Sequence, residues 1–423
     1  MISSNPKRLY ASPPFFKITR AAIHNQIATQ FKFDFSGYVI VFIGLFSQKP
    51  VFSNCRFEIS MNPKLYSLII VVALIAGFHQ ASAQVTNLGI APAAGGQSIL
   101  YWPVSSTTYV LQTTTNLSST NWVTVLNAGP VTAVTVSNTL PAKFFRLSAL
   151  PAGMTLIPAG AFTMGNSIGD TNITDANPTN IYISAFAMDL NQVTYGLWTN
   201  VYAYATNRGY NFANPGVNRG TGTNYPVEQV DWFDSVKWSN ARSQQAGLTP
   251  VYYTDAGFTQ VFTNGDINTT VYQNLAVNGY RLPTEAEWEK AARGGLSGQR
   301  FPWGDLIGES QANYKLGSGE TFDLGGTELY AGIPNPVGVF PANGYGLTDM
   351  SGNSFEWCWD WYGTPYGQPT AINPTGAGPA SGLRVCRGGS WYDTADLARC
   401  PARCSTTPTN AYGDVGFRCV RGL

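Results

Sequence analysis

The sequence contains only two histidines in 423 residues, His24 and His79, and both lie near its beginning. The rest of the chain therefore cannot run a Ser-His-Asp or Cys-His mechanism, and it cannot build the usual histidine-containing zinc or iron sites. Charge is also scarce, because Asp, Glu, Lys and Arg make up 12% of the residues and the net charge is +1. No basic patch indicates a nucleic acid partner, and no acidic run indicates a disordered tail. Any catalysis must use cysteine, carboxylates, hydroxyls or a metal held without imidazole.

Glycine and aromatic residues are abundant instead, with 44 Gly, 22 Tyr and 11 Trp. Glycine permits backbone angles that other residues rarely adopt, and large aromatic side chains fill irregular cores. Given its length, the chain is expected to form two or three domains with many loops.

Residues 61–84 have the pattern of a secretory signal peptide. A short apolar run over residues 65–78 is followed by Ala-Ser-Ala at 81–83, a small-x-small cleavage signal. The run is too short to span a bilayer, which takes about 20 residues. We therefore expect residues 61–83 to be removed and residues 1–60 to be a mis-called start or a disordered extension. The mature protein would be secreted or periplasmic, with no integral membrane segment. The alternative is a genuine long N-terminal region with an internal anchor.

Export implies an oxidising compartment, in which cysteines form disulfides. The mature part has five cysteines, all in its last 70 or so residues: Cys358, Cys386, Cys400, Cys404 and Cys419. Because five is odd, at least one thiol is free or pairs between molecules.

Two regions with different patterns of residue types follow the predicted signal peptide. Residues 84–150 alternate apolar and polar side chains between turn residues, which predicts a small antiparallel, sandwich-like β module that serves as a spacer or attachment. In residues 151–423 we predict three helices, with N-caps at Thr194, Asp231 and Thr284. Thr284 and Glu287 form a capping box, and a hairpin over residues 251–280 separates the second helix from the third.

Six motifs then occur in order: residues 154–165 (MTLIPAGAFTMG), 278–295 (NGYRLPTEAEWEKAARGG), 301–304 (FPWG), 343–357 (NGYGLTDMSGNSFEW), 387–391 (RGGSW) and 416–419 (GFRC). Together they resemble the sulfatase-modifying-factor family, whose enzymes generate formylglycine. The resemblance covers Met154 to about Arg421. It implies an α+β domain over residues 151–423 with an irregular fold related to C-type lectins.

The resemblance also implies a structural calcium site in the fourth motif. Asp349 and Glu356 would give side-chain oxygens, and Gly352 and Ser354 would give carbonyls, the hard ligands that calcium prefers. The alternative is that the two carboxylates only cap N–H groups of the loop.

A second calcium site of the family corresponds to Asn313 and the Tyr314 carbonyl, with a downstream aspartate. Asp323 is the nearest aspartate, although its spacing is shorter than the family's.

The family's oxidases are similar to copper(I) enzymes in which two cysteines, five positions apart, hold the metal. Soft thiolates suit copper(I), and such chemistry needs no histidine. Counting back from the last motif, the resemblance places the reactive cysteine at Cys400 and the first one at Ala395, where there is no thiol. Cys404 is the substitute that the sequence offers. Asp414 also departs from the family, whose oxidases typically carry Asn there.

Structural roles compete with copper binding at every cysteine. Cys400 and Cys404 can form a local disulfide or be two buried thiols. Cys358 and Cys386, in aromatic strand contexts, can be buried thiols or one disulfide.

Two functions follow. One is an exported oxidase that converts a cysteine of a sulfatase-like protein or peptide to formylglycine, with Cys400 and Cys404 as catalytic and copper-binding residues. The alternative is a non-catalytic extracellular lectin-like module that binds a glycan, a peptide or a protein partner.

Overall fold

The computed structural model describes residues 142–423 apart from 267–269, 318, 327–331, 365 and 367–371, and mainly strand segments before residue 142. It divides into two units, residues 1–149 and 150–423. Each unit is described by itself.

The described part of the first unit consists mainly of strands. A seven-stranded sheet has the order β1-β2-β3-β4-β10-β7-β8, and a three-stranded sheet has the order β5-β6-β9. The strands are β1 (Lys17–Ile23), β2 (Gln26–Phe35), β3 (Tyr38–Leu45), β4 (Ile69–Ala73), β5 (Gly89–Ala93), β6 (Gln97–Tyr101), β7 (Tyr109–Thr114), β8 (Val123–Thr124), β9 (Ala133–Ser137) and β10 (Ala142–Ala149). The described segments of residues 84–150 include strands β5 to β10, and the predicted sandwich-like module stays a prediction. The predicted start and cleavage of the signal stay predictions.

The second unit contains the three predicted helices, each beginning at its predicted cap. They are α1 (Tyr195–Thr206), α2 (Trp232–Gln245) and α3 (Glu285–Ala292). The Thr284 hydroxyl accepts from the Glu287 N–H while the Glu287 carboxylate accepts from the Thr284 N–H, so the capping box is confirmed.

Short sheets surround the helices. The central one has the order β19-β18-β17-β20, and a second, β11-β14-β21, joins the beginning of the unit to its end. The strands are β11 (Met154–Ile157), β12 (Gly160–Met164), β13 (Thr179–Ile183), β14 (Phe186–Asp189), β15 (Tyr252–Tyr253), β16 (Tyr272–Gln273), β17 (Phe355–Trp361), β18 (Arg384–Arg387), β19 (Cys404–Thr406), β20 (Val415–Gly416) and β21 (Val420–Arg421). β15 pairs with β16 inside the predicted hairpin region.

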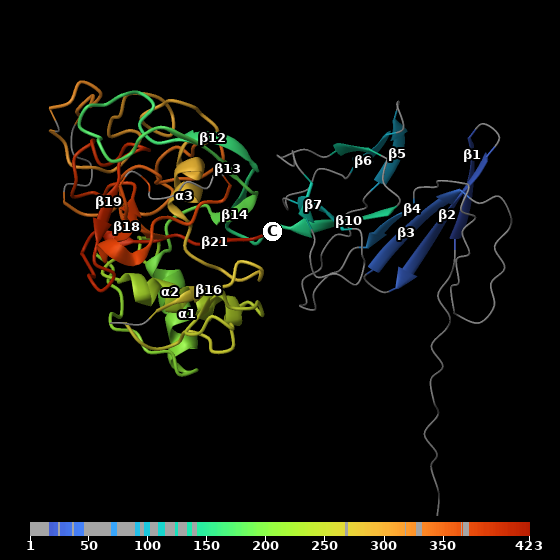
Figure 1. The fold of residues 1–423 in the computed structure, drawn as a ribbon, viewed down its shortest axis with the longest axis horizontal. Coiled ribbons are helices and arrows are strands. Elements are labelled where there is room, and N and C mark those ends of the chain that lie inside the picture. The colour runs from blue at the N-terminus through green and yellow to red at the C-terminus, as the bar shows by residue number, and fades with distance from the viewer. Residues whose placement is uncertain are drawn as a thin grey trace, which may run out of the picture. The chain divides into compact units, whose positions relative to one another are not determined.

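Two packed regions hold the second unit together. α1 and α2 lie side by side, and the Trp198 and Trp238 rings stack between them with centroids 5.7 Å apart. α3 packs against β12, β17 and β18 (Figure 1), with Trp288 fully buried. This second region includes Cys400 and carries the loops of the candidate site. Among the described residues, the helices lack the combined length and hydropathy needed to cross a membrane.

Candidate functional site

The glycine loop over residues 349–356 adopts unusual backbone conformations. Asp349 and Asn353 have φ angles of 56° and 67°, in the left-handed region that costs a residue with a side chain about 1–2 kcal/mol. Gly352 has φ 77°, and a methyl group there would lie 2.2 Å from the carbonyl oxygen of Asn313. The Asn353 N–H donates to that carbonyl at 2.7 Å. The loop is therefore pressed against residue 313, which brings the two predicted calcium sets next to each other.

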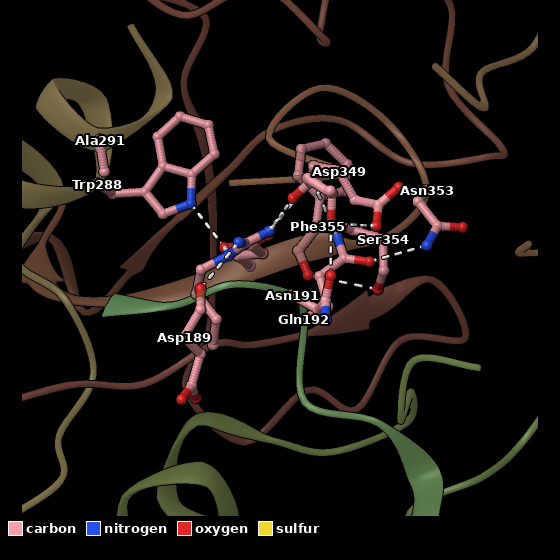
Figure 2. Close-up of polar contacts among 12 residues, drawn as sticks. Asp189, Asn191, Gln192, Trp288, Ala291, Asp349, Asn353, Ser354 and Phe355 are labelled. Atoms are coloured by element: carbon pink, nitrogen blue, oxygen red, sulfur yellow. Dashed lines mark hydrogen bonds and ion pairs between the residues drawn. The ribbon is translucent and has the colours of Figure 1, made fainter. Parts of the chain in front are cut away.

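Gln192 lies at the centre of the loop's contacts. Its amide nitrogen donates to the Ser354 carbonyl at 2.7 Å, and its amide oxygen accepts from the Asn353 side chain at 2.9 Å. The Asp349 carbonyl lies 3.5 Å from the same nitrogen. Figure 2 shows Asp349, Asn353 and Ser354 gathered around Gln192. The loop thus directs two carbonyls at one amide nitrogen.

The Asp349 carboxylate is buried and only half satisfied. Its Oδ2 accepts from the Gly338 N–H at 2.8 Å and from the Thr348 hydroxyl at 3.1 Å. Its Oδ1 has no hydrogen-bond partner. Burial raises the pKa of Asp349, because the charged form is poorly solvated there. A bound cation would satisfy this oxygen.

Glu356, by contrast, already has charged and polar partners. The Arg418 guanidinium donates to its two carboxylate oxygens at 2.7 and 2.8 Å, and the Trp288 indole donates to it at 2.7 Å. Both Glu356 and Arg418 are buried, so this bidentate pair neutralises the carboxylate inside the core.

The second predicted set is engaged mainly within the protein. The Tyr314 hydroxyl donates to Asp323 Oδ1 at 2.7 Å, and the Gly325 N–H donates to the same oxygen at 2.9 Å. The Asn313 side-chain nitrogen donates to the Ile333 carbonyl at 3.0 Å. Asp323 therefore lies beside the ring of Tyr314.

A calcium ion requires six to eight oxygens. Asp349 offers an open one, but Glu356 is held by Arg418, and the Ser354 carbonyl faces an amide donor. The arrangement fits a cation bound through Asp349, and a four-residue site would require Arg418 and Gln192 to move. Both calcium assignments stay predictions.

Asp231, Asp234 and Asp266 form the acidic group of the described residues that is compact enough for a metal. The buried Lys237 ammonium lies there already, 3.2 Å from Asp234 Oδ1 and 2.5 Å from Asp266 Oδ1. Because this ammonium pairs with Asp234 and Asp266, it supplies positive charge that a metal would otherwise bring.

The thiol of Cys400 lies in the hydrophobic core beside α3 and is 0% exposed. Desolvation raises its pKa to about 12, opposed by the charges of Arg293 and Arg387. Two hydrogen bonds fix the backbone of Cys400. The Cys400 N–H donates to the Arg300 carbonyl at 2.6 Å, and the Arg387 guanidinium donates to the Cys400 carbonyl at 2.9 Å. A neutral thiol sealed from solvent is a poor nucleophile and a poor metal ligand.

Cys404 has a different neighbour from the predicted one. It lies on β19 directly opposite Cys386 on β18. Cys386 is fully buried and Cys404 is half-buried. All five cysteines of residues 142–423 are free thiols, so neither predicted disulfide, Cys400–Cys404 or Cys358–Cys386, is present in this described part.

A copper(I) ion needs two thiolates on opposite sides of it. The Cys404 thiol faces Cys386, and Ala395, at the position of the family's first cysteine, offers no sulfur. Ala395 is buried in a separate apolar cluster with Phe301. The residues present therefore do not fit a copper(I) site built from Cys400 and Cys404.

The site residues that sequence reasoning missed are Gln192, Arg418 and Glu228. Arg418 lies inside the last motif, so the motif carried a signal for it, but its partner Glu356 is 62 positions away. Glu228 accepts from the Trp391 indole at 2.9 Å, and no local pattern around it indicates this contact.

The chain is similar to several known proteins over about two thirds of its length. The chaperone protein LppX of Paenibacillus barcinonensis is 33% identical over 279 residues, which are 63% of this chain and 89% of that protein. The formylglycine-generating enzyme of Bos taurus is 34% identical over 291 residues, 64% of this chain and 75% of that enzyme. Among solved structures, Treponema denticola variable protein 1 is 28% identical with a TM-score of 0.49, over 63% of this chain and 94% of that one.

The family described as the sulfatase-modifying factor enzyme 1-like domain matches residues 142–423, about two thirds of the chain and all six motifs. The expected α+β, C-type-lectin-like fold of the second unit is thereby confirmed. The chain belongs to the sulfatase-modifying factor family.

Proposed function

We propose that residues 151–423 form a non-catalytic recognition module that is exported and binds a peptide or protein partner. The observation that carries this proposal is the state of Cys400, which is completely buried and has no second thiol at the family's position. Copper(I) chemistry of the family's type requires a solvent-reachable pair of thiolates, so a Cys400 buried without such a partner among the described residues supports recognition without oxidation.

The relatives support either outcome for a member of this family. One similar protein carries the name of a chaperone and another the name of a formylglycine-generating enzyme, at nearly equal identity. A chaperone acts by binding proteins, so recognition without oxidation agrees with the first relative. Export is supported by the signal-like pattern of residues 61–84.

The oxidase is the second candidate. It is favoured by Arg293 and Arg387, whose charges lower the pKa of the Cys400 thiol against the larger effect of burial. Calcium is proposed only at Asp349, whose Oδ1 has no hydrogen-bond partner.

The deciding experiment incubates the full chain, secreted from a bacterial host, with copper(I), oxygen and a sulfatase-type cysteine peptide. Mass spectrometry follows aldehyde formation, with the Bos taurus enzyme as the positive control. We expect unmodified peptide with this chain. An aldehyde product that disappears in Cys400→Ser would overturn the proposal and establish the oxidase.

A further inference from the structure

Four carboxylates gather where three loops of the second unit meet, and we call this group, with its neighbouring rings, the acid–aromatic patch. It consists of Glu228, Asp393, Asp396, Asp414, Trp391 and Tyr392. The Ser390 hydroxyl is in hydrogen-bond contact with Asp393 and also with Asp414, at 2.8 Å in the second case. A single hydroxyl hydrogen cannot serve both carboxylates at once.

The patch contains carboxyl oxygens that its surroundings leave without a hydrogen bond. Glu228 is 0% exposed, yet its Oε2 has no hydrogen-bond partner, and neither does the buried Oδ1 of Asp396. Within the described residues, Glu228 makes one long ion pair, 3.9 Å from Arg219 Nε to its Oε2. Lys315 and Arg399 are the other nearby cations, and the Arg399 Nε donates to the Asp396 backbone carbonyl at 2.8 Å. Burial raises the pKa of Glu228 to about 8, so this carboxyl is largely protonated at neutral pH until a cation pairs with it.

Aromatic rings beside the acids provide faces for a cation. Tyr392 is 63% exposed, and the Lys315 ammonium lies 5.7 Å from the centre of its ring. The Arg219 guanidinium lies 5.8 Å from the centre of the Trp391 ring. Rings attract cations at such distances through their negative faces. Two of the chain's own cations therefore already occupy the positions that a cationic ligand would use.

Arg219 covers the buried acid only loosely. Its side chain is 39% exposed, and its guanidinium crosses directly over the backbone of Gly413. Arg219 is held by this long ion pair and by its contact with the Trp391 ring, and each such interaction at a partly exposed side chain contributes only about 1 kcal/mol or less, so a ligand can displace it. Moving Arg219 aside would open Glu228 Oε2.

We propose that the acid–aromatic patch binds the guanidinium or ammonium group of a peptide ligand, which replaces Arg219 at Glu228 and lies against Trp391. This assignment rests on the proposed recognition function and names its ligand class. An organic cation is favoured over a metal, because the described acids close enough to share one ion are Asp231, Asp234 and Asp266, which lie outside the patch. A planar guanidinium can pair with a carboxylate and stack on a ring at the same time.

The test measures binding of an arginine-containing peptide and of the same peptide with citrulline, by calorimetry on the full chain. We expect affinity for the arginine peptide only, weakened by salt and reduced about tenfold in Glu228→Gln. Arginine amide serves as a second probe, which separates recognition of the side chain from recognition of a peptide backbone.

Gly413→Ala should strengthen binding of the arginine peptide, whereas Glu228→Gln should weaken it, and Gly413→Ala leaves all four carboxyl groups of the patch in place. A methyl group at 413 would lie 2.0 Å from Arg219 Nη2, at the far end of a flexible side chain, so the guanidinium must leave. We expect this variant, and Arg219→Ala, to bind the arginine peptide more tightly than the natural chain does. Equal binding of the citrulline peptide, or unchanged affinity in Gly413→Ala, would overturn the assignment even if Glu228→Gln failed to fold.

The two proposals fail separately. Absence of cation binding removes the patch assignment and leaves the recognition function open to other surfaces. Aldehyde formation by the chain removes the recognition proposal, whatever the patch binds.

A different observation concerns Cys386 and Cys404, which face each other across adjacent antiparallel strands. Cα atoms of directly opposite residues lie about 4.5–5.5 Å apart in such a ladder, within the range that a disulfide spans. We infer that these two thiols become one disulfide when the exported protein meets a small or protein disulfide as oxidant. The Cys404 thiolate attacks the oxidant and releases one of its sulfurs as a thiol. Cys386 then attacks the Cys404 sulfur and releases the second as a thiol.

Closing this bond would clamp residues 387–403, the segment that carries Ser390, Trp391 and Asp393 of the patch and also Cys400. Peptide mapping without reduction, after treatment with oxidised glutathione, should show Cys386 joined to Cys404 and three remaining thiols among the five. Cys419→Ser should keep the cross-link and Cys404→Ser should lose it. Five free thiols after treatment, or a Cys400–Cys404 link, would overturn this inference.

Discussion

Glu289→Gln tests the buried ionic cluster that holds the Cys400 segment in place. Glu289 is 0% exposed, and its Oε1 accepts from Arg293 at 2.7 Å and from the Gly165 N–H at 2.6 Å. Its Oε2 pairs with Arg387, which in turn donates to the Cys400 carbonyl. The substitution keeps the shape and removes the charge between two buried guanidinium groups.

Removing one partner of a buried ion pair costs about 3–5 kcal/mol of unfolding free energy. Arg387 keeps a second acid, Glu285, at 3.2 Å, so we expect the lower end, about 3 kcal/mol. For a unit of this size that loss corresponds to a fall of about 6–12 °C in Tm. Glu320→Gln, on an exposed hydrogen bond, is the matched control and should change stability by about 0.5 kcal/mol or less.

The pKa of Glu289 determines how its contribution to the free energy of unfolding changes with pH. Burial opposes ionisation of Glu289, but Arg293 and Arg387 together hold its pKa below the usual 4.5. The unfolded chain therefore takes up the proton first, and the contribution of Glu289 is present above pH 4.5 and lost as pH falls through the folded pKa. Urea unfolding at pH 7 and near pH 4 should show the gap between the natural chain and Glu289→Gln narrowing. A loss under about 1 kcal/mol at pH 7, or a gap that widens on acidification, would refute the reasoning.

Three further predictions concern the loops and the acidic group. Added calcium should raise the Tm of the natural chain and leave the Tm of Asp349→Asn unchanged, because a bound ligand stabilises the folded state. A Tm of the natural chain that a chelator does not lower would contradict this prediction. Gly352→Ala should lose about 1–3 kcal/mol by urea unfolding, because φ is 77° and the methyl group meets the Asn313 carbonyl; a neutral effect contradicts the loop geometry. Lys237→Met should lose about 3 kcal/mol or more at pH 7, because it leaves Asp234 and its neighbours unpaired, and equal stability of the two proteins would mean that the acids are protonated or solvated.

Local signals in the sequence were sufficient for the helices of the second unit. Thr194, Asp231 and Thr284 each cap the helix that follows them, because a cap bonds within three residues and needs no distant partner. The capping box at Thr284 could be predicted from the sequence for the same reason.

The contacts of the site were harder to predict from the sequence, because they join segments that lie far apart along the chain. Gln192 meets the glycine loop about 160 positions later, and Arg418 reaches back to Glu356. The pairing of Cys386 with Cys404 depends on the register of β18 and β19, which cysteine spacing does not encode. Asp349 was identified from its motif, whereas the orphaned oxygen that supports a cation there is a three-dimensional property.

The most direct test of the central claim is a copper(I) titration of the Cys386→Ser variant. This variant retains Cys400 and Cys404, the two predicted copper ligands, and removes the thiol that faces Cys404. We predict no copper held at one ion per chain, because the Cys400 thiol is sealed in the core without a second sulfur. Stoichiometric, tight binding that is lost on further substitution of Cys400 would contradict the account.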